Sequence, residues 1–287
     1  MKTKEQRLRN IFDEETGRAV MIPMDHGING VMEGLEDPLE ALEQFVQLGV
    51  EAVLMNFGII KLAQPYLRNA RKTRNAQKTP GIIMGADFNL RWPSWKSPIE
   101  GDVILGHCFQ ARVEQAVKYD VDALKVYFAL GLEPSLQLTV VRNISELVTE
   151  CDRYDMPLMI EPVTEGQYIA EGNKTDPAII ADGCRIAVEL GADLLKPPYL
   201  GDREAFAALC KNSHVPVVML GGTKKNDIQS IFRVAREGID AGARGTIFGR
   251  NVWQRPVEEM RRVIKGLQEI VHEAAGVEET LARHDLV

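Results

Sequence analysis

Short apolar segments alternate with longer amphipathic segments along almost the whole chain. The apolar segments, which we expect to be strands, cover residues 18–25, 51–57, 81–87, 121–130, 156–162, 192–196, 215–220 and 244–248. The amphipathic segments, which we expect to be helices, cover residues 39–48, 58–70, 109–119, 134–154, 176–190, 202–210, 227–241 and 256–275. Strands that are apolar on both faces are typical of a parallel sheet covered by helices.

The number and order of these units indicate a closed barrel. Gly49, Gly191 and Gly242 each stand between a predicted helix and the next strand, where glycine permits the left-handed turn that ends a helix. Eight strand–helix units in 287 residues predict an α/β protein, a (β/α)8 TIM barrel in a single domain. A short N-terminal helical extension and a C-terminal helix from about residue 256 complete the predicted domain. A dinucleotide-binding sheet is disfavoured, because the turn Met24-Asp25-His26-Gly27 lacks its glycine-rich fingerprint.

One segment breaks the alternation. Residues 88–107 read as a loop and contain two of the three tryptophans, Trp92 and Trp95, with Pro93 and Pro98. Long loops inside compact domains are usually functional, and aromatic residues disfavour disorder. We expect this loop to be a lid, a wall of the active site or a subunit contact.

Composition narrows the class of protein. The net charge of -7 gives no sign of a nucleic-acid or membrane partner, although a local cationic pocket can still exist. No apolar run reaches transmembrane length and the N-terminus lacks a signal-peptide segment, so we expect a cytoplasmic protein. The four cysteines form no CxxC pair, which is typical of a reduced protein. Cys108, beside His107 and near a predicted helix start, remains an alternative nucleophile.

Polar residues and glycines gather where the predicted strands end, which is where barrel enzymes place their chemistry. These residues are Asp25, His26, Asn56, Asp87, Asn89, Lys125, Tyr127, Glu161, Lys196, Gly221, Gly222, Thr223, Lys224, Gly249, Arg250 and Asn251. Two lysines and several carboxylates converging on one barrel mouth indicate catalysis better than any one of them alone.

Lys196 is the candidate nucleophile. A lysine at the end of a buried strand is desolvated, and desolvation favours the neutral amine that attacks a carbonyl. Lys125 can act as a second cation that disfavours protonation of Lys196, or it can form an ion pair with Asp25 or Glu161. Glu161 and Asp25 are the candidates for moving protons.

The last two strands predict a phosphate site. Gly221, Gly222 and Gly249 allow backbone N–H groups to approach an anion, and Arg250 can donate a forked contact. The alternative is that the glycines only form tight turns. A metal site is not indicated, because of the five histidines only His26 is placed at the barrel mouth. We expect His26 to orient Asp25 or to shape a substrate pocket together with Tyr199.

Four segments together resemble the class I Schiff-base aldolases, and the likeness runs from about Arg18 to Gln254. They are Ile22-Pro23-Met24-Asp25-His26-Gly27, Gly191-Ala192-Asp193 with Lys196, Val215-Pro216-Val217-Val218 with Gly221-Gly222, and Gly245 with Gly249-Arg250-Asn251. That family includes archaeal-type fructose-bisphosphate aldolase, aminodideoxyheptulosonate synthase, the autoinducer-2 thiolase-like enzyme and tagatose-bisphosphate aldolase.

The resemblance implies Lys196 as the Schiff-base lysine, Asp25 as an acid/base partner, and Arg250 with the strand-seven glycines as phosphate ligands. The archaeal-type branch has a catalytic tyrosine where this chain has Glu161. Lys125 and Glu161 instead resemble the lysine and glutamate of the tagatose-bisphosphate and sulfofructose-phosphate aldolase branch.

We therefore expect a class I aldolase, a lyase without cofactor or metal, that acts on a phosphorylated ketose. Transaldol transfer or thiolase-like acyl transfer on a phosphorylated ketone remains an alternative, as does a non-catalytic paralogue that senses sugar phosphates. A homo-oligomer is expected from the family.

Overall fold

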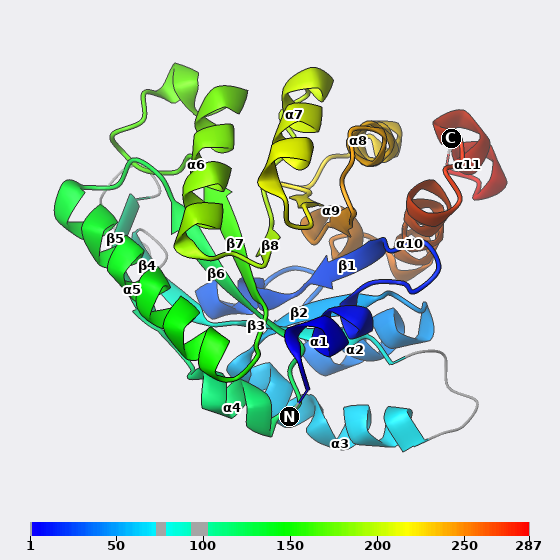
Figure 1. Cartoon of the computed structure of the whole chain (residues 1–287). Helices are drawn as coiled ribbons and strands as arrows, with labels where there is room; N and C mark the ends of the chain where they lie inside the picture. Colours follow the sequence, from blue (N-terminus) through cyan, green and yellow to red (C-terminus); the bar gives the residue numbers. More distant parts are fainter. Residues whose placement is uncertain (1, 73–78, 93–102, 287) are drawn as a thin grey trace.

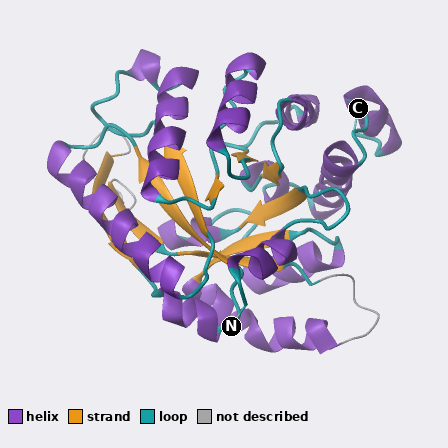
Figure 2. Ribbon diagram, in the orientation of Figure 1, coloured by secondary structure: helices purple, strands orange, loops and turns teal. Residues whose placement is uncertain are grey.

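Eight parallel strands form the centre of the protein, and helices surround them (Figure 1, Figure 2). The structure is a computed structural model that describes residues 2–72, 79–92 and 103–286. Its parallel strands are β1 (Ala19–Pro23), β2 (Ala52–Asn56), β3 (Gly81–Gly85), β6 (Ala123–Ala129), β7 (Leu158–Val163), β8 (Leu194–Leu195), β9 (Val218–Leu220) and β10 (Gly245–Ile247).

The strands close on themselves. Hydrogen-bonded neighbours follow the order β8-β7-β6-β3-β2-β1-β10-β9. Parallel bridges from Leu195 to Val217 and from Pro198 to Leu220 join β8 to β9. The predicted (β/α)8 barrel is therefore confirmed, and every strand predicted from an apolar run is present.

The helices lie outside the barrel. They are α2 (Pro38–Gln47), α3 (Phe57–Lys72), α4 (Val113–Lys118), α5 (Pro134–Arg153), α6 (Pro177–Leu190), α7 (Arg203–Ser213), α8 (Ile228–Asp240) and α10 (Val257–His272). Two further helices, α9 (Arg250–Trp253) and α11 (Val277–Arg283), were not predicted, and neither were the 3-10 turns η1 (Asp25–Asn29) and η2 (Glu171–Asn173). The prediction that a helix begins at residue 109 was wrong, since α4 begins at Val113.

Local sequence explains where several helices begin and end. The carboxylates of Asp37, Glu133 and Asp176 accept backbone N–H groups at the starts of α2, α5 and α6, each of which has proline at its first turn. At the other end, Gly49 and Gly191 have φ of 71° and 109°. These angles are available to glycine without steric strain, so the helices end where the sequence predicted.

Inward and outward residues alternate along each strand and build two cores. The outer core fills the space between strands and helices, and the inner core fills the barrel. The inner core consists of Ile11, Phe12, Ala19, Met21, Ala52, Leu54, Ile83, Ala123, Met159, Leu194, Val218 and Ile247. Because the inner core includes residues of the N-terminal extension, this extension seals one end of the barrel.

That extension is the helix α1 (Lys4–Ile11), which lies at the N-terminal ends of the strands. Lys4 Nζ lies 2.9 Å from Asp193 Oδ2, just before β8, and Asn10 Nδ2 donates to Asp122 Oδ1 at 2.7 Å, just before β6. Asp193 and Asp122 also accept N–H groups of neighbouring strands. The polar contacts at this end are structural, which leaves the opposite end open for a site.

The segment predicted as a loop over residues 88–107 is partly an antiparallel hairpin. Strand β4 (Asp87–Trp92) pairs with β5 (Val103–Phe109). The hairpin adds a second small sheet to the C-terminal end of β3. Pro93, Trp95 and Pro98 lie outside the described residues, and the prediction of a loop was wrong for the described remainder, which forms β4 and β5.

Candidate active site

The period of the strands directs three charged side chains into the C-terminal mouth of the barrel. Each lies two positions after a residue of the inner core, and residues two apart on a strand share a face. The pairs are Ala123 and Lys125 on β6, Met159 and Glu161 on β7, and Leu194 and Lys196 on and just after β8. Lys196 N donates a hydrogen bond of 2.9 Å to Ile160 O, which holds Lys196 next to β7.

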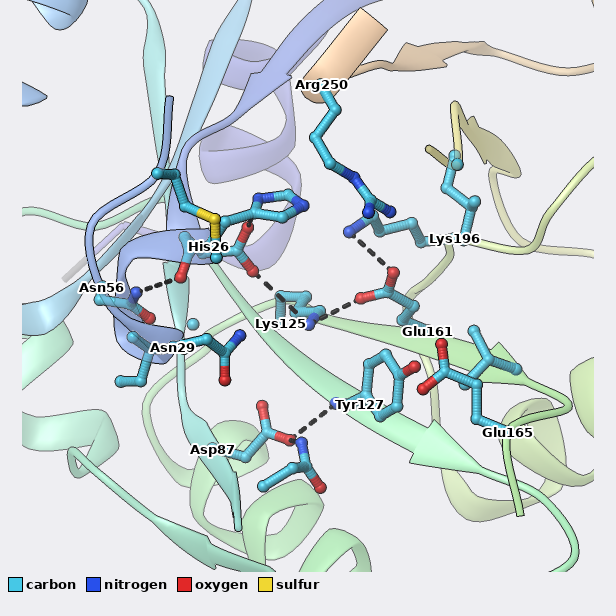
Figure 3. A pocket seen from close by; sticks show the side chains of 18 of the residues that line it. His26, Asn29, Asn56, Asp87, Lys125, Tyr127, Glu161, Glu165, Lys196 and Arg250 are labelled. Atoms are coloured by element: carbon cyan, nitrogen blue, oxygen red, sulfur yellow. Dashed lines mark hydrogen bonds and ion pairs between the residues drawn. The ribbon is translucent and has the colours of Figure 1, made fainter. Parts of the chain in front are cut away.

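Glu161 lies between the two lysines (Figure 3). Its Oε2 is 2.6 Å from Lys125 Nζ, and its Oε1 is 2.9 Å from Lys196 Nζ. Asp25 Oδ2, on the turn after β1, is 3.6 Å from Lys125 Nζ. The side chains of Lys125, Glu161 and Lys196 are at most 8% exposed. Two lysine amines and two carboxylates therefore meet at one point, where opposite charges offset the cost of burial.

The charges of this cluster stabilise one another. Burial acts to raise the pKa of Asp25, but Lys125, His26 and Lys196 outweigh it and hold the pKa well below its ordinary value. Burial likewise opposes ionisation of Glu161, and the two lysines hold its pKa below the ordinary value. Burial acts to lower the pKa of Lys125, but Glu161, Asp25 and Asp87 outweigh it and raise the pKa. Lys125 is therefore a fixed cation that holds both carboxylates ionised.

The cluster forms the floor of a cavity of about 690 Å³. The described residues that line the cavity are Asp25, His26, Ile28, Asn29, Met32, Asn56, Gly85, Asp87, Asn89, Lys125, Tyr127, Glu161, Val163, Glu165, Lys196, Leu220, Gly222, Thr223 and Arg250. A cavity of this size suits a small metabolite.

Arg250 provides a cation on one side of the cavity. It begins α9 after β10, and its side chain reaches toward the lysine pair (Figure 3). Its Nε is buried and has no hydrogen-bond partner in the described part of the chain. Gly222 and Thr223, after β9, line the same side. A buried guanidinium nitrogen without an acceptor is suited to an anionic ligand.

Comparison with known proteins decides the family. Residues 19–255 match the model of the DeoC/LacD family aldolases. This chain belongs to that family. An uncharacterised aldolase of Saccharolobus solfataricus is 27% identical to it over 282 residues, which cover 96% of this chain and 97% of the relative. The 2-amino-4,5-dihydroxy-6-oxo-7-(phosphonooxy)heptanoate synthase of Streptomyces griseus is 26% identical over 87% of this chain and 84% of the synthase.

Solved structures agree with the family and the fold. A Schiff-base-forming fructose-1,6-bisphosphate aldolase superposes with a TM-score of 0.71 at 25% identity, over 94% of this aldolase and all of that chain. An archaeal fructose 1,6-bisphosphate aldolase gives a TM-score of 0.74 at 23% identity and supports the barrel fold. The predicted resemblance and the prediction of an enzyme, a lyase, are confirmed.

The structure brings together most of the predicted site residues of this aldolase. Lys196, Glu161, Asp25 and Lys125 form the cluster, and Lys125 lies as an ion-pair partner of both Asp25 and Glu161. His26 lines the cavity, with its Nδ1 3.4 Å from Asp25 Oδ1. The side chain of His26 also packs edge-on against Trp253 at 5.3 Å between ring centres.

Two of the predicted phosphate-binding glycines do not line the cavity. A Cβ on Gly221 would lie 2.9 Å from the ring of Phe248, and one on Gly249 would lie 3.0 Å from Pro23. Close packing against neighbouring residues explains the absence of a side chain at both positions. Gly222, with φ of 68°, does line the cavity.

The prediction that Tyr199 helps to shape the substrate pocket was wrong. Its hydroxyl donates to Glu237 Oε2 on α8 at 2.8 Å, and its ring packs edge-on against Phe206. The side chain therefore points away from the cavity into the helical layer. Burial together with Glu237 raises the pKa of Tyr199 to about 12, which is consistent with a neutral structural hydroxyl.

Cys108 was considered as a nucleophile near a helix start, and that placement was wrong. It lies inside strand β5, is exposed and does not line the cavity. In the described ranges, no group of three or more histidine, cysteine or acidic side chains is arranged to hold a metal ion. No described helix is long and apolar enough to cross a membrane.

Sequence reasoning placed Asp87 and Asn89 at a strand end but missed their partner. Asp87 Oδ2 lies 3.2 Å from Nε2 of His107, whose side chain is fully buried. His107 stands twenty positions further along the chain, across the β4–β5 ladder, where its Cα pairs with that of Asn89. The sequence signal that could have found His107 is its position near the far end of the segment that begins with Asp87 and Asn89.

Proposed function

We propose that this protein is a class I aldolase in which Lys196 forms a Schiff base with a phosphorylated ketose. The observation that carries the proposal is the Glu161 carboxylate held between two buried lysine amines at the floor of the cavity. One amine, that of Lys196, faces a carboxylate oxygen at 2.9 Å, the distance at which protons move between the two groups. The other amine, Lys125, keeps that carboxylate in place.

The chemistry follows from this arrangement. Lys196 Nζ passes a proton to Glu161 Oε1 and, as the neutral amine, adds to the ketone carbon to give a carbinolamine, which loses water to give an iminium. A carboxyl group donates the proton that the leaving hydroxide needs, and Glu161 is placed for this step. A base then removes the proton of the substrate hydroxyl, the neighbouring carbon–carbon bond breaks, and its electron pair moves to the iminium. The aldehyde leaves, and hydrolysis of the protonated enamine releases the ketone.

A phosphate on the substrate is supported by Arg250. Arg250 lines the cavity that also holds Lys196, and its buried Nε has no hydrogen-bond partner in the described part of the chain. The name of the Streptomyces griseus relative places a phosphonooxy group on the carbon next to an oxo group. A ketone flanked by phosphate would lie with its carbonyl at Lys196 and its phosphate at Arg250, Gly222 and Thr223. Each proposed step uses side chains of one chain. That the protein forms a homo-oligomer in the cytoplasm stays a prediction.

Trapping of the iminium tests the proposal. Wild-type protein is incubated with dihydroxyacetone phosphate and sodium borohydride, which reduces an iminium to a stable amine, and the peptides are analysed by mass spectrometry. We expect the adduct on the peptide that carries Lys196. Lys196→Arg is the matched control, because arginine keeps the positive charge but forms no such adduct. An adduct on another lysine, or none when a ketose phosphate is turned over, would contradict the mechanism.

A further inference from the structure

Asp87 lies in the cavity with one carboxylate oxygen occupied and the other available. Its Oδ2 accepts hydrogen bonds from Asn89 Nδ2 at 3.0 Å and from Tyr127 N at 3.1 Å, with His107 Nε2 3.2 Å away. No donor to Oδ1 is found among the described residues, although the side chain is only 3% exposed. The carboxylate points into the cavity (Figure 3). A nearly buried acceptor atom without a donor indicates a ligand group that donates.

His107 packs against this carboxylate, with its Nε2 on the side of Asp87 Oδ2. Asn143 Nδ2 lies 2.9 Å from His107 Nδ1 and 3.4 Å from the carbonyl oxygen of His107. Asn143 therefore holds the ring of His107 in place beside Asp87. His107 contacts Asp87 and does not line the cavity.

The cavity has two sides of opposite charge. Arg250 follows β10, whereas Asp87 follows β3, three strands further around the barrel. In Figure 3 the two side chains lie on opposite sides of Lys125 and Glu161. The described residues beside Asp87 in the lining include the neutral amides of Asn29, Asn56 and Asn89. One substrate that spans the lysine cluster would therefore meet a cation at one end and a carboxylate with amides at the other.

We propose that the Asp87 side of the cavity binds an unphosphorylated, hydroxyl-bearing end of the ketose, so that the enzyme prefers ketose 1-phosphates to 1,6-bisphosphates. This inference rests on the proposed function and deepens it. Asp87 Oδ1 would accept the hydrogen bond of a substrate hydroxyl, and the neighbouring amides can donate to and accept from other hydroxyls. Asp87 would then determine specificity at the end of the substrate that leaves as the aldehyde.

Charge excludes the alternatives at this position. His107 and Lys125 outweigh the effect of burial and hold the pKa of Asp87 below its ordinary value, so the group is an anion at neutral pH. A second phosphate would meet that anion in a site shielded from water, where like charges repel strongly. An ammonium group would meet the repulsion of Lys125, whose charge already acts on Asp87. A hydroxyl group satisfies the free oxygen without adding charge.

Two measurements on the same protein test this. The first is kcat/KM for fructose 1-phosphate and tagatose 1-phosphate against the matching 1,6-bisphosphates, for wild type and Asp87→Asn. The second is borohydride trapping of dihydroxyacetone phosphate on Lys196, which involves only the half of the substrate that stays on the enzyme. Asp285→Asn, on a side chain that is 99% exposed, makes the same change in net charge outside the cavity.

We expect wild type to favour the monophosphates. Asp87→Asn should lower kcat/KM for them about 10-fold to 100-fold, the usual effect of losing a hydrogen bond to a charged group. The substitution should also reduce the ratio of kcat/KM for monophosphates to kcat/KM for bisphosphates, and it should leave borohydride trapping unchanged. The control Asp285→Asn should keep wild-type values in both measurements. A wild type that favours bisphosphates, or a variant that loses trapping and turnover equally, overturns the inference. If Asp87→Asn fails to fold, the wild-type ratio alone decides. Absence of trapping in wild type contradicts the proposed function instead.

Discussion

Replacement of Glu161 by glutamine removes the charge that joins the two lysines but keeps the shape of the side chain. In the structure, the carboxylate contacts Lys125 at 2.6 Å and Lys196 at 2.9 Å, one oxygen to each. The amide has one oxygen and one NH2 group, so one ammonium group loses its acceptor and faces a donor. Lys125 keeps Asp25 at 3.6 Å, whereas Lys196 has no other carboxylate partner in the described part of the chain.

The magnitude separates folding from catalysis. Breaking a buried ion pair by removing one partner costs about 3–5 kcal/mol, which a domain with about 5–15 kcal/mol of stability can tolerate. Loss of a positioned acid/base group typically lowers turnover by about 10²–10⁴-fold, equal to about 3–5 kcal/mol of transition-state stabilisation. We therefore expect Glu161→Gln to fold, to form the iminium on Lys196 more slowly than wild type and to lose most of its turnover.

The assay pairs steady-state cleavage of a ketose phosphate with borohydride trapping and thermal unfolding. Glu165→Gln is the matched control, because it makes the same substitution on an exposed residue that lines the same cavity. The control should keep both trapping and turnover. Full turnover in folded Glu161→Gln would remove Glu161 from the acid/base role, and trapping at the wild-type rate would remove it from the step that forms the iminium.

Three further predictions concern the rest of the site. Arg250→Ala should raise KM for phosphorylated substrate about 10-fold to 100-fold, as expected for a charged contact to phosphate, and an equal loss with an unphosphorylated analogue would contradict phosphate binding there. Tyr199→Phe should keep full activity and lower stability by about 1 kcal/mol through the lost bond to Glu237, measured by urea unfolding, whereas a fall in kcat/KM would return Tyr199 to the site. The folded-state pKa of Asp25 is lowered, so its stabilising contribution is fully present above the unfolded value of about 4 and is lost as pH falls further. Asp25→Asn should thus show a weaker loss of unfolding free energy on acidification, and an unchanged acid slope would contradict the buried charge pairing.

The barrel could be predicted because its information is local. Each strand is an apolar run, and each turn from helix to strand uses a residue suited to it, such as Gly191 in the left-handed region. The hairpin of β4 and β5 could not be predicted in the same way. Strand β4 alternates polar and apolar residues, with Asp87 and Asn89 on one side, so it lacks the apolar run that marked the barrel strands. Strand β5 does begin with an apolar run, residues 103–105, but this run falls inside the segment that was predicted as a loop.

The sequence by itself determined the order of the strands, the ends at which polar residues gather, and the position of Lys196 at one of those ends. These follow from periodicity and from the cost of placing a charge at the end of an apolar strand. The direction of single side chains depended on packing between elements. Tyr199 follows Lys196 by three positions, yet it turns outward to Glu237 because the chain has left the strand.

Only the tertiary structure decided which charged groups meet. Glu161 is opposite Tyr127 in the ladder between β6 and β7, and its contact with Lys125 is diagonal, set by the register of the two strands. The pairing of Asp87 with His107 likewise requires the hairpin to fold back on itself. Register and hairpin pairing are contacts between distant parts of the chain, and the pattern along one segment does not contain them.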